Sequence, residues 1–257
     1  MTGPVERTFR VHGDTVSAYV RGGAETLVFL HGLGCAKESA LGALREPRLD
    51  RFGLCAIDLP GHGASTVPDG RAVTVEYCAE VVDAVLAEVG GTVTLVGHSL
   101  GAAVGLVSGT RFRRFISVEG NLVPADCGTV SRRIAGQPLA GFRATGFADL
   151  LAELARPDAD VPPEWVRWFA GCDPTAVHQT ACSLVALTDS GRLLTHYLSL
   201  RNQTYVYGDS ASRPEQALFA LAGTRTRGIP RSGHFPMLDN TTRFYALIAD
   251  LAESEED

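Results

Sequence analysis

A serine between two glycines is the first candidate for chemistry in this chain. Residues 97–101 read Gly-His-Ser-Leu-Gly, a G-x-S-x-G pattern centred on Ser99. The pattern follows the apolar run 93–96 and opens the apolar stretch 100–108, so we expect a strand, a sharp turn and a helix. The two glycines allow such a turn, which would expose the Ser99 hydroxyl near the positive end of the helix. The local sequence therefore predicts a nucleophilic serine.

A serine hydroxyl needs a base to take its proton, and His234 is the best placed of seven histidines. It lies in Ser232-Gly-His-Phe-Pro, directly after the last predicted strand. His98 lies inside the serine turn and His62 in Asp58-Leu-Pro-Gly-His-Gly, so we expect both to shape a turn or line the pocket. Asp58 itself is expected to bond nearby backbone N–H groups. The histidines with no comparable setting are His12, His178 and His196.

The acid that would orient His234 has two candidates. Glu119 follows the predicted strand 114–118, and Asp209 follows the predicted strand 203–208. A carboxylate at the tip of a buried strand is costly unless it is satisfied, and an imidazole N–H would satisfy it while fixing the tautomer needed for catalysis. We favour Glu119 because it has the longer reach, whereas Asp209 directly follows Gly208, where a local turn can use it. Asp209 stays the alternative, and a site without a functional acid stays open.

Apolar runs and helical periodicity predict the elements that must position these residues. Helical spacing of apolar residues over 73–89 separates two short apolar runs, and strand, helix, strand implies parallel pairing with right-handed crossovers. We therefore predict an α/β fold, a mostly parallel twisted sheet with helices on both faces. An N-terminal hairpin around Gly13 and Asp14 forms its edge. The predicted strands are 26–30, 53–58, 92–97, 114–118, 203–208 and 224–228, and further helices are expected at 214–221 and from about 240.

The segment 122–198 separates two of the predicted strands and is too long for a structureless loop. It is proline-rich and suggests short helices at 147–155, 163–170 and 174–187. We predict that it is an inserted helical cap, and that residues 1–121 together with 199–257 form the core. Trp165 and Trp168 mark the apolar face of a cap helix, where they pack in the cap core or wall the pocket.

Composition excludes several classes of function. The 257 residues carry a net charge of −6 and no long Lys/Arg tract, so we do not expect nucleic acid as a partner. No apolar run reaches the roughly 18 residues of a membrane helix. The six cysteines show no C-x-x-C spacing and the start shows no signal peptide, so we expect reduced, buried thiols in a cytoplasmic protein. Nothing in the sequence calls for a metal or a cofactor.

Four motifs occur in one order along the chain, namely His31-Gly-Leu-Gly, Asp58-Leu-Pro-Gly-His-Gly, Val96-Gly-His-Ser-Leu-Gly and Ser232-Gly-His-Phe. With them the chain resembles α/β-hydrolase-fold proteins over nearly its whole length. The resemblance implies an oxyanion hole formed by the backbone N–H groups of Leu33 and Leu100, and makes His31 and His98 candidates for the pocket wall. Such proteins commonly carry the acid as Gly-x-x-Asp, which here falls on Ala211. Some subfamilies are similar to this chain in placing a Glu at the earlier strand end.

The expected activity is hydrolysis of an ester or thioester of a largely apolar small molecule. Ser99 would form an acyl-enzyme that water resolves. Serine rather than aspartate at position 99 argues against epoxide hydrolase and dehalogenase chemistry, which in related proteins needs a carboxylate nucleophile. The alternatives are C–C bond hydrolysis or acyl transfer to an internal nucleophile at the same site and, less favoured, a small-molecule receptor without catalysis.

Overall fold

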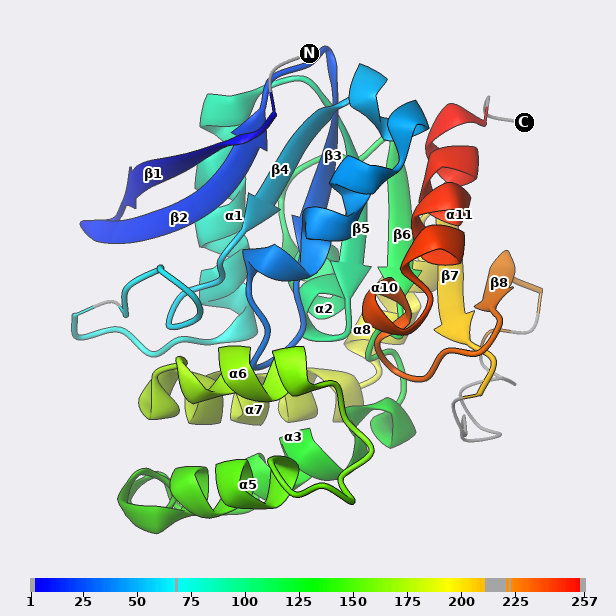
Figure 1. The fold of residues 1–257 in the computed structure, drawn as a ribbon. Helices are drawn as coiled ribbons and strands as arrows, with labels where there is room; N and C mark the ends of the chain where they lie inside the picture. Colours follow the sequence, from blue (N-terminus) through cyan, green and yellow to red (C-terminus); the bar gives the residue numbers. More distant parts are fainter. Residues whose placement is uncertain (1–2, 68, 211–220, 222, 255–257) are drawn as a thin grey trace.

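A twisted sheet runs through the middle of the molecule (Figure 1). The structure is a computed structural model that describes residues 3–67, 69–210, 221 and 223–254. Within these residues the sheet has eight strands in the order β1-β2-β4-β3-β5-β6-β7-β8. The strands are β1 (Val5–Val11), β2 (Asp14–Arg21), β3 (Glu25–Leu30), β4 (Gly53–Ile57), β5 (Thr92–His98), β6 (Arg114–Val118), β7 (Gln203–Gly208) and β8 (Thr226–Ile229).

Strand direction divides the sheet into an antiparallel edge and a parallel body. β1 and β2 form the predicted hairpin, and β2 pairs antiparallel with β4. All pairings from β4 through β8 are parallel. β4 and β6 are buried along their whole length, as expected for parallel strands covered on both faces. The prediction of a mostly parallel α/β sheet is confirmed, and all the carboxyl ends of its parallel strands meet at one edge.

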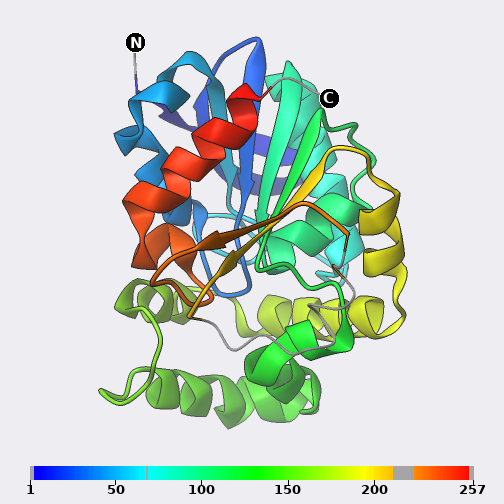
Figure 2. The same ribbon diagram turned by 90° about the vertical axis from the view of Figure 1, so that its right-hand side faces the viewer.

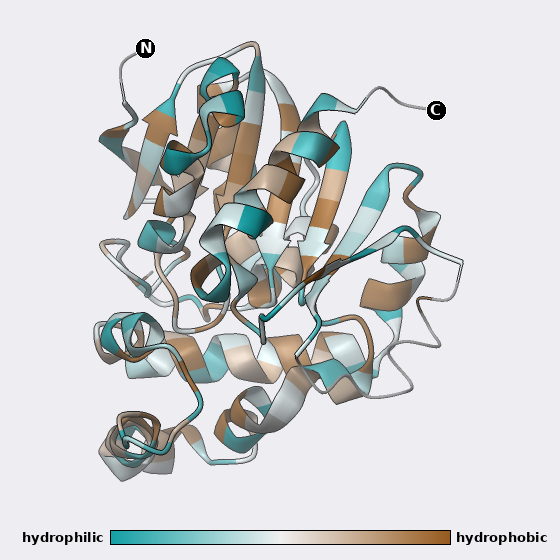
Figure 3. Ribbon diagram, turned by 45° about the vertical axis from the view of Figure 1, so that its right-hand side comes forward, coloured by the Kyte–Doolittle hydropathy of each residue, from teal (hydrophilic) through white to brown (hydrophobic). Residues whose placement is uncertain are grey.

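Helices cover both faces of the sheet. Figure 2 shows η1 (Lys37–Arg45) and α11 (Thr241–Glu253) on one side, and α1 (Val75–Val89), α2 (Leu100–Val107) and α8 (Arg192–Ser199) on the other. The predicted helix 73–89 corresponds to α1, which begins after Thr74, whose side chain accepts a hydrogen bond from the Tyr77 N–H. Figure 3 shows hydrophobic residues both in the central strands and along the helices around them. The short elements η2 (Pro47–Arg51) and α10 (Pro236–Asp239) pack near α11.

Between β6 and β7 the chain forms a layer of helices below the carboxyl ends of the strands (Figure 1). We call residues 124–189 the inserted helices. The expected helices at 147–155, 163–170 and 174–187 are present as α5, α6 and α7, whereas α3 was not predicted. The inserted helices are η3 (Pro124–Cys127), α3 (Gly128–Ala135), α4 (Leu139–Gly141), η4 (Phe142–Gly146), α5 (Phe147–Leu154), α6 (Pro163–Ala170) and α7 (Pro174–Asp189).

Helix α8 was also not predicted, and it packs on the sheet. It contacts α2, and the ring of its Tyr197 lies 6.3 Å from the Phe115 ring and 6.4 Å from the Tyr205 ring. The last residues of the expected cap therefore cover a face of the sheet, while the division of the chain at 122 and 198 stays a prediction. The predicted helix 214–221, except for Leu221, and the position Ala211 lie outside the described residues. No helix in the described part of the chain is both long and apolar enough to span a bilayer.

Candidate active site

Ser99 occupies the turn between β5 and α2. Its backbone has φ of 50° and ψ of −116°, a conformation that non-glycine residues rarely adopt outside functional sites. The Ser99 N–H donates to the Val118 carbonyl at 2.9 Å, which fastens the turn to the neighbouring strand β6. Helix α2 starts so close to β3 that a Cβ at Gly101 would lie 2.1 Å from the Leu30 carbonyl oxygen. Only glycine fits there, so the G-x-S-x-G pattern has a direct steric cause.

Glu119 and His234 meet at the same edge of the sheet. Glu119 lies at the tip of β6 with φ of 49°, and its Oε1 accepts the Gly208 N–H at 2.8 Å. Its other oxygen, Oε2, lies 3.6 Å from His234 Nδ1, and the two side chains are 9% and 43% exposed, respectively. This separation exceeds a hydrogen bond, and catalytic contacts of this kind often shorten when substrate binds. The carboxylate is thus anchored by the main chain through Oε1 while Oε2 faces the imidazole.

Asn121 is a site residue that the sequence interpretation missed. The Ser99 hydroxyl donates to Asn121 Oδ1 at 3.3 Å, and Asn121 Nδ2 donates to the Asp126 carbonyl at 2.8 Å. A carbonyl oxygen can only accept, so this second bond fixes which end of the amide faces Ser99. In the described part of the chain no hydrogen bond joins the Ser99 hydroxyl to His234. The sequence offered only a weak signal, a polar residue two positions after Glu119 and just beyond a predicted strand.

His98 lies between the serine turn and the loop of His234. Its Nε2–H donates to the His234 main-chain carbonyl at 2.8 Å, and the two rings lie 5.0 Å apart. Burial lowers the pKa of His98 well below the ordinary range of an imidazole, and the neighbouring His234 lowers it further. His98 therefore stays neutral, and its bond holds the main chain of the residue that faces Glu119.

Residues 31–36 follow β3 and carry Leu33, one of the two expected oxyanion donors, so we call them the oxyanion loop. His31 Nε2 accepts the Leu59 N–H at 3.0 Å, so its Nδ1 carries the proton and donates to the Gly32 carbonyl at 2.8 Å. Burial lowers the pKa of His31 to about 4, which keeps the ring neutral. Leu33 lines the cavity above Ser99, and Leu100 is the first residue of α2, where an N–H has no partner within the helix.

Asp209, the alternative acid, bonds to the loop that precedes His234. Its Oδ1 accepts the Arg231 N–H at 2.8 Å and the Ser210 hydroxyl at 3.3 Å. Asp58 is fully buried and accepts the N–H of Ala64, a local bond of the expected kind. It also binds Lys37 Nζ at 2.8 Å, an ion pair that the sequence interpretation did not include.

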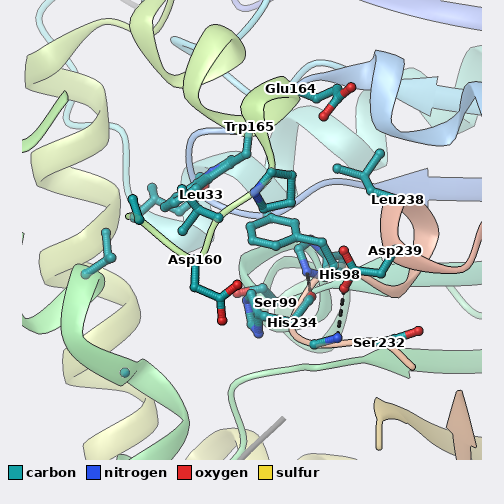
Figure 4. Close-up of a pocket in the computed structure, with 18 of the residues that line it drawn as sticks. Leu33, His98, Ser99, Asp160, Glu164, Trp165, Ser232, His234, Leu238 and Asp239 are labelled. Atoms are coloured by element: carbon teal, nitrogen blue, oxygen red, sulfur yellow. Dashed lines mark hydrogen bonds between the residues drawn. The ribbon is translucent and has the colours of Figure 1, made fainter. Parts of the chain in front are cut away.

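The cavity above Ser99 has a volume of about 1140 Å³. Figure 4 shows Ser99, His98 and His234 on its strand side, and Asp160, Glu164 and Trp165 on the side of the inserted helices. His31 and Trp168 are not among its lining residues. The apolar lining includes Leu33, Val161, Trp165, Phe235 and Leu238, and the charged lining consists of Asp126, Asp160, Glu164, Arg231 and Asp239. The lining therefore combines apolar and charged side chains.

Backbone strain concentrates at this site. Four non-glycine residues in the described ranges have positive φ, and three of them, Ser99, Glu119 and Arg231, lie around the cavity or at the strand tip beside it. Such strain persists only where surrounding contacts enforce it, and it marks functional positions. The described residues contain no group of three or more His, Cys, Asp or Glu side chains arranged to bind a metal ion.

Comparisons with known proteins agree on the fold. A family model described as "Alpha/beta hydrolase family" matches residues 27–247. The dihydrolipoyllysine-residue acetyltransferase component of the acetoin cleaving system of Cupriavidus necator is 30% identical over 168 residues, which are 52% of this chain and 44% of that protein. The match thus spans less than half the length of that relative.

Solved structures resemble the whole chain at low sequence identity. An esterase from Thermogutta terrifontis superposes with a TM-score of 0.76 and 20% identity, covering 98% of both chains. A mutant of the N-acyl homoserine lactonase AidH, complexed with N-hexanoyl homoserine, superposes with a TM-score of 0.75 and 17% identity, covering 99% of both chains. Likeness at this identity establishes the architecture, and the chemistry has to be argued from the site.

Proposed function

The chain belongs to the alpha/beta hydrolase family, and we propose that it is a cofactor-free serine hydrolase that cleaves an ester or thioester through an acyl-enzyme on Ser99. The observation that carries the proposal is the pairing of Glu119 Oε2 with His234 Nδ1 at 3.6 Å, beside the strained Ser99 turn. A nucleophile, a base and an acid that orients the base are thereby available at one edge of the sheet.

Acylation starts with a change of partner for the serine hydroxyl. Ser99 Oγ turns from Asn121 Oδ1 toward His234 Nε2, which takes the proton as Oγ attacks the carbonyl carbon of the substrate. Glu119 favours the tautomer that carries the proton on His234 Nδ1 and stabilises the imidazolium that forms. The N–H groups of Leu33 and Leu100 donate hydrogen bonds to the substrate oxygen as it becomes negatively charged. Losing one such donor costs about 3 kcal/mol of transition-state stabilisation.

Departure of the leaving group completes acylation, and deacylation by water then returns the enzyme to its starting state. The His234 imidazolium donates its proton to the departing alkoxide or thiolate, which leaves as an alcohol or thiol. Water then attacks the acyl carbonyl while His234 accepts a proton, and collapse of the intermediate releases a carboxylic acid and restores the Ser99 hydroxyl. Once its hydroxyl is restored, Ser99 can again donate to Asn121 Oδ1, as it does in the resting structure.

The cavity supports a substrate with both an apolar and a polar part. Its volume of about 1140 Å³ lies above the roughly 300–1,000 Å³ of ordinary ligand pockets. Leu238 and Phe235 offer apolar contacts near His234, whereas Asp160 and Arg231 offer charged groups. We expect esters that combine an alkyl or aryl group with a polar substituent to be cleaved better than purely aliphatic ones.

Pre-steady-state kinetics with p-nitrophenyl esters test the proposal. An acyl-enzyme gives a burst of p-nitrophenol equal to the enzyme concentration whenever deacylation is the slower step. We expect a burst with the wild type and none with Ser99→Ala. Turnover that persists in Ser99→Ala would refute the covalent mechanism. A wild type that binds esters without cleaving them would instead support the small-molecule receptor.

A further inference from the structure

Helix α6 touches the oxyanion loop through a buried hydrogen bond. The indole Nε1–H of Trp165 donates to the Leu33 carbonyl at 3.0 Å. Trp165 is 6% exposed and Leu33 is 7% exposed, so water does not compete for this bond. The donor comes from the inserted helices and the acceptor from the loop after β3, which are 132 residues apart in the sequence.

A second contact lies one helical turn further along α6. Gly34 has φ of 72°, and a Cβ placed on it would lie 1.9 Å from Cδ2 of Phe169. The Phe169 ring therefore packs directly against the main chain of Gly34. Trp165 and Phe169 are four residues apart, which puts both on one face of the helix, and their rings meet edge to face at 5.6 Å. One face of α6 thus holds two successive residues of the oxyanion loop.

The same indole also reaches the other half of the site. Its ring lies 5.3 Å from the ring of Phe235, the residue that follows His234. Phe235 in turn lies 5.2 Å from the His234 ring and 5.3 Å from the His98 ring. Trp165 therefore contacts both the loop with Leu33 and the residue next to His234, two segments whose relative position matters for the proposed catalysis.

We propose that Trp165 is a positioning residue that holds the oxyanion loop in its catalytic geometry, so that the inserted helices complete the oxyanion hole. The bond to the Leu33 carbonyl fixes the peptide plane between Leu33 and Gly34, on the far side of the Leu33 Cα from the plane that carries the Leu33 N–H. That preceding plane is held by His31 Nδ1, which donates to the Gly32 carbonyl, so the bond from Trp165 holds the second side of the Leu33 hinge. A donor misplaced by about 1 Å stabilises a developing oxyanion far less, although the substrate still binds. This inference rests on the proposed serine hydrolase function.

Trp165→Phe tests the role because it keeps an aromatic ring on Phe235 and removes the N–H donor. We expect kcat for a p-nitrophenyl ester to fall about tenfold with KM within twofold of the wild type. The rate of inactivation by a fluorophosphonate should fall by a similar factor. Amide hydrogen exchange of residues 31–36 should become faster in the folded protein. Trp168→Phe, on the same helix and outside the cavity lining, is the matched control and should change none of these quantities.

Substitution of benzothiophene for the indole at position 165 provides a second, isosteric variant in case Trp165→Phe fails to fold. Loss of kcat at constant KM together with faster exchange in residues 31–36 supports the role. Wild-type kcat and wild-type exchange in either folded variant overturn it, as does a change confined to KM, which would make Trp165 only a wall of the pocket. A wild type that reacts with neither esters nor fluorophosphonate refutes the proposed function instead, and the exchange rates then still decide whether Trp165 holds the loop.

Discussion

The two halves of the candidate site are held in different ways. The acid–base half consists of side chains on strand ends and a loop, with Glu119 anchored by the Gly208 N–H and His234 43% exposed beside it. The oxyanion half consists of main chain, and residues 31–36 are buried. The buried side chain of Trp165, from helix α6, donates a hydrogen bond to this main chain at Leu33. Lys37, the residue that follows the loop, forms an ion pair with Asp58.

The difference follows from what each half must do. A histidine that moves protons can work next to water, because the carboxylate behind it fixes its tautomer. The direction of a main-chain N–H is set by the backbone, so the surroundings must immobilise the segment that carries it. Exclusion of water from that segment also strengthens the interaction of the N–H with a negative charge. Changes in the first half should therefore alter catalysis alone, whereas changes in the second should alter stability as well.

Ser99→Ala should have the largest effect, a loss of at least about 10⁴ in kcat, because triad members depend on one another almost completely. The alanine fits the same turn, so the unfolding temperature should stay near that of the wild type. Steady-state assays with a p-nitrophenyl ester measure the loss. Ser199→Ala, which removes a hydroxyl bonded to the carbonyl of His196 on the surface helix α8, is the control and should keep full activity.

Glu119→Gln should lower kcat by about 10³ to 10⁴. The Gln oxygen would accept the Gly208 N–H, which turns the amide NH₂ toward His234 Nδ1 and imposes the wrong tautomer. Asp209→Asn, which alters the bond to the Arg231 N–H, should cost much less. Assays of both variants with one substrate compare them. If kcat collapsed in Asp209→Asn and stayed near the wild-type value in Glu119→Gln, the assignment of the acid would be reversed.

The pH dependence of the free energy of unfolding should show that the fold holds His31 in the buried half of the site neutral. Burial lowers the pKa of His31 from 6.5 to about 4. Between these values the unfolded chain binds a proton at this ring and the folded chain does not, so the free energy of unfolding falls as pH falls through that window. The expected loss from His31 approaches about 3 kcal/mol near pH 4.

Urea unfolding from pH 7 to pH 4 measures this loss in the wild type and in His31→Gln, which cannot titrate there. The variant should show a shallower decline than the wild type. The remaining decline belongs to other groups, among them His62, whose pKa burial lowers to about 3. Parallel curves for the two proteins would show that His31 is not held neutral by the fold.

Asn121→Ala should have the smallest effect, a loss of about 1–2 kcal/mol in the free energy of unfolding. The buried Asn121 amide no longer donates to the Asp126 carbonyl, and loss of a hydrogen bond of this kind costs an amount of this order. Asn202→Ala removes a similar bond, to the Arg113 carbonyl, away from the site. Both variants should lose similar stability in urea titrations, but only Asn121→Ala should change the burst rate. If the burst rate also changed in Asn202→Ala, the kinetic effect would reflect the general loss of stability and not a role of Asn121 beside Ser99.

The sequence predicted the parts of the site that rest on short-range rules. The glycines around Ser99, the strand before it and the loop histidine His234 form contiguous patterns, so the parallel sheet and the turn of the serine could be expected. The pattern also placed Glu119 at a strand tip, where the structure finds it 3.6 Å from His234.

Contacts between distant segments could not be predicted in this way. The bond from Trp165 to Leu33 depends on how α6 docks, which no local pattern encodes. The mixed lining of the cavity likewise depends on which side chains of the inserted helices face it. Tertiary packing decides these features, and for the same reason the substrate could not be derived from the sequence.

Intact-mass spectrometry after exposure to a fluorophosphonate tests most directly whether Ser99 is an activated nucleophile. The reagent phosphonylates a serine activated by a base and an oxyanion hole, with loss of fluoride. The tryptic peptide 72–111 contains two serines, Ser99 and Ser108, which tandem spectra distinguish. We expect one adduct per chain, on Ser99, and none in Glu119→Gln over the same interval. An unmodified wild type, or an adduct on another residue, would contradict the proposed mechanism.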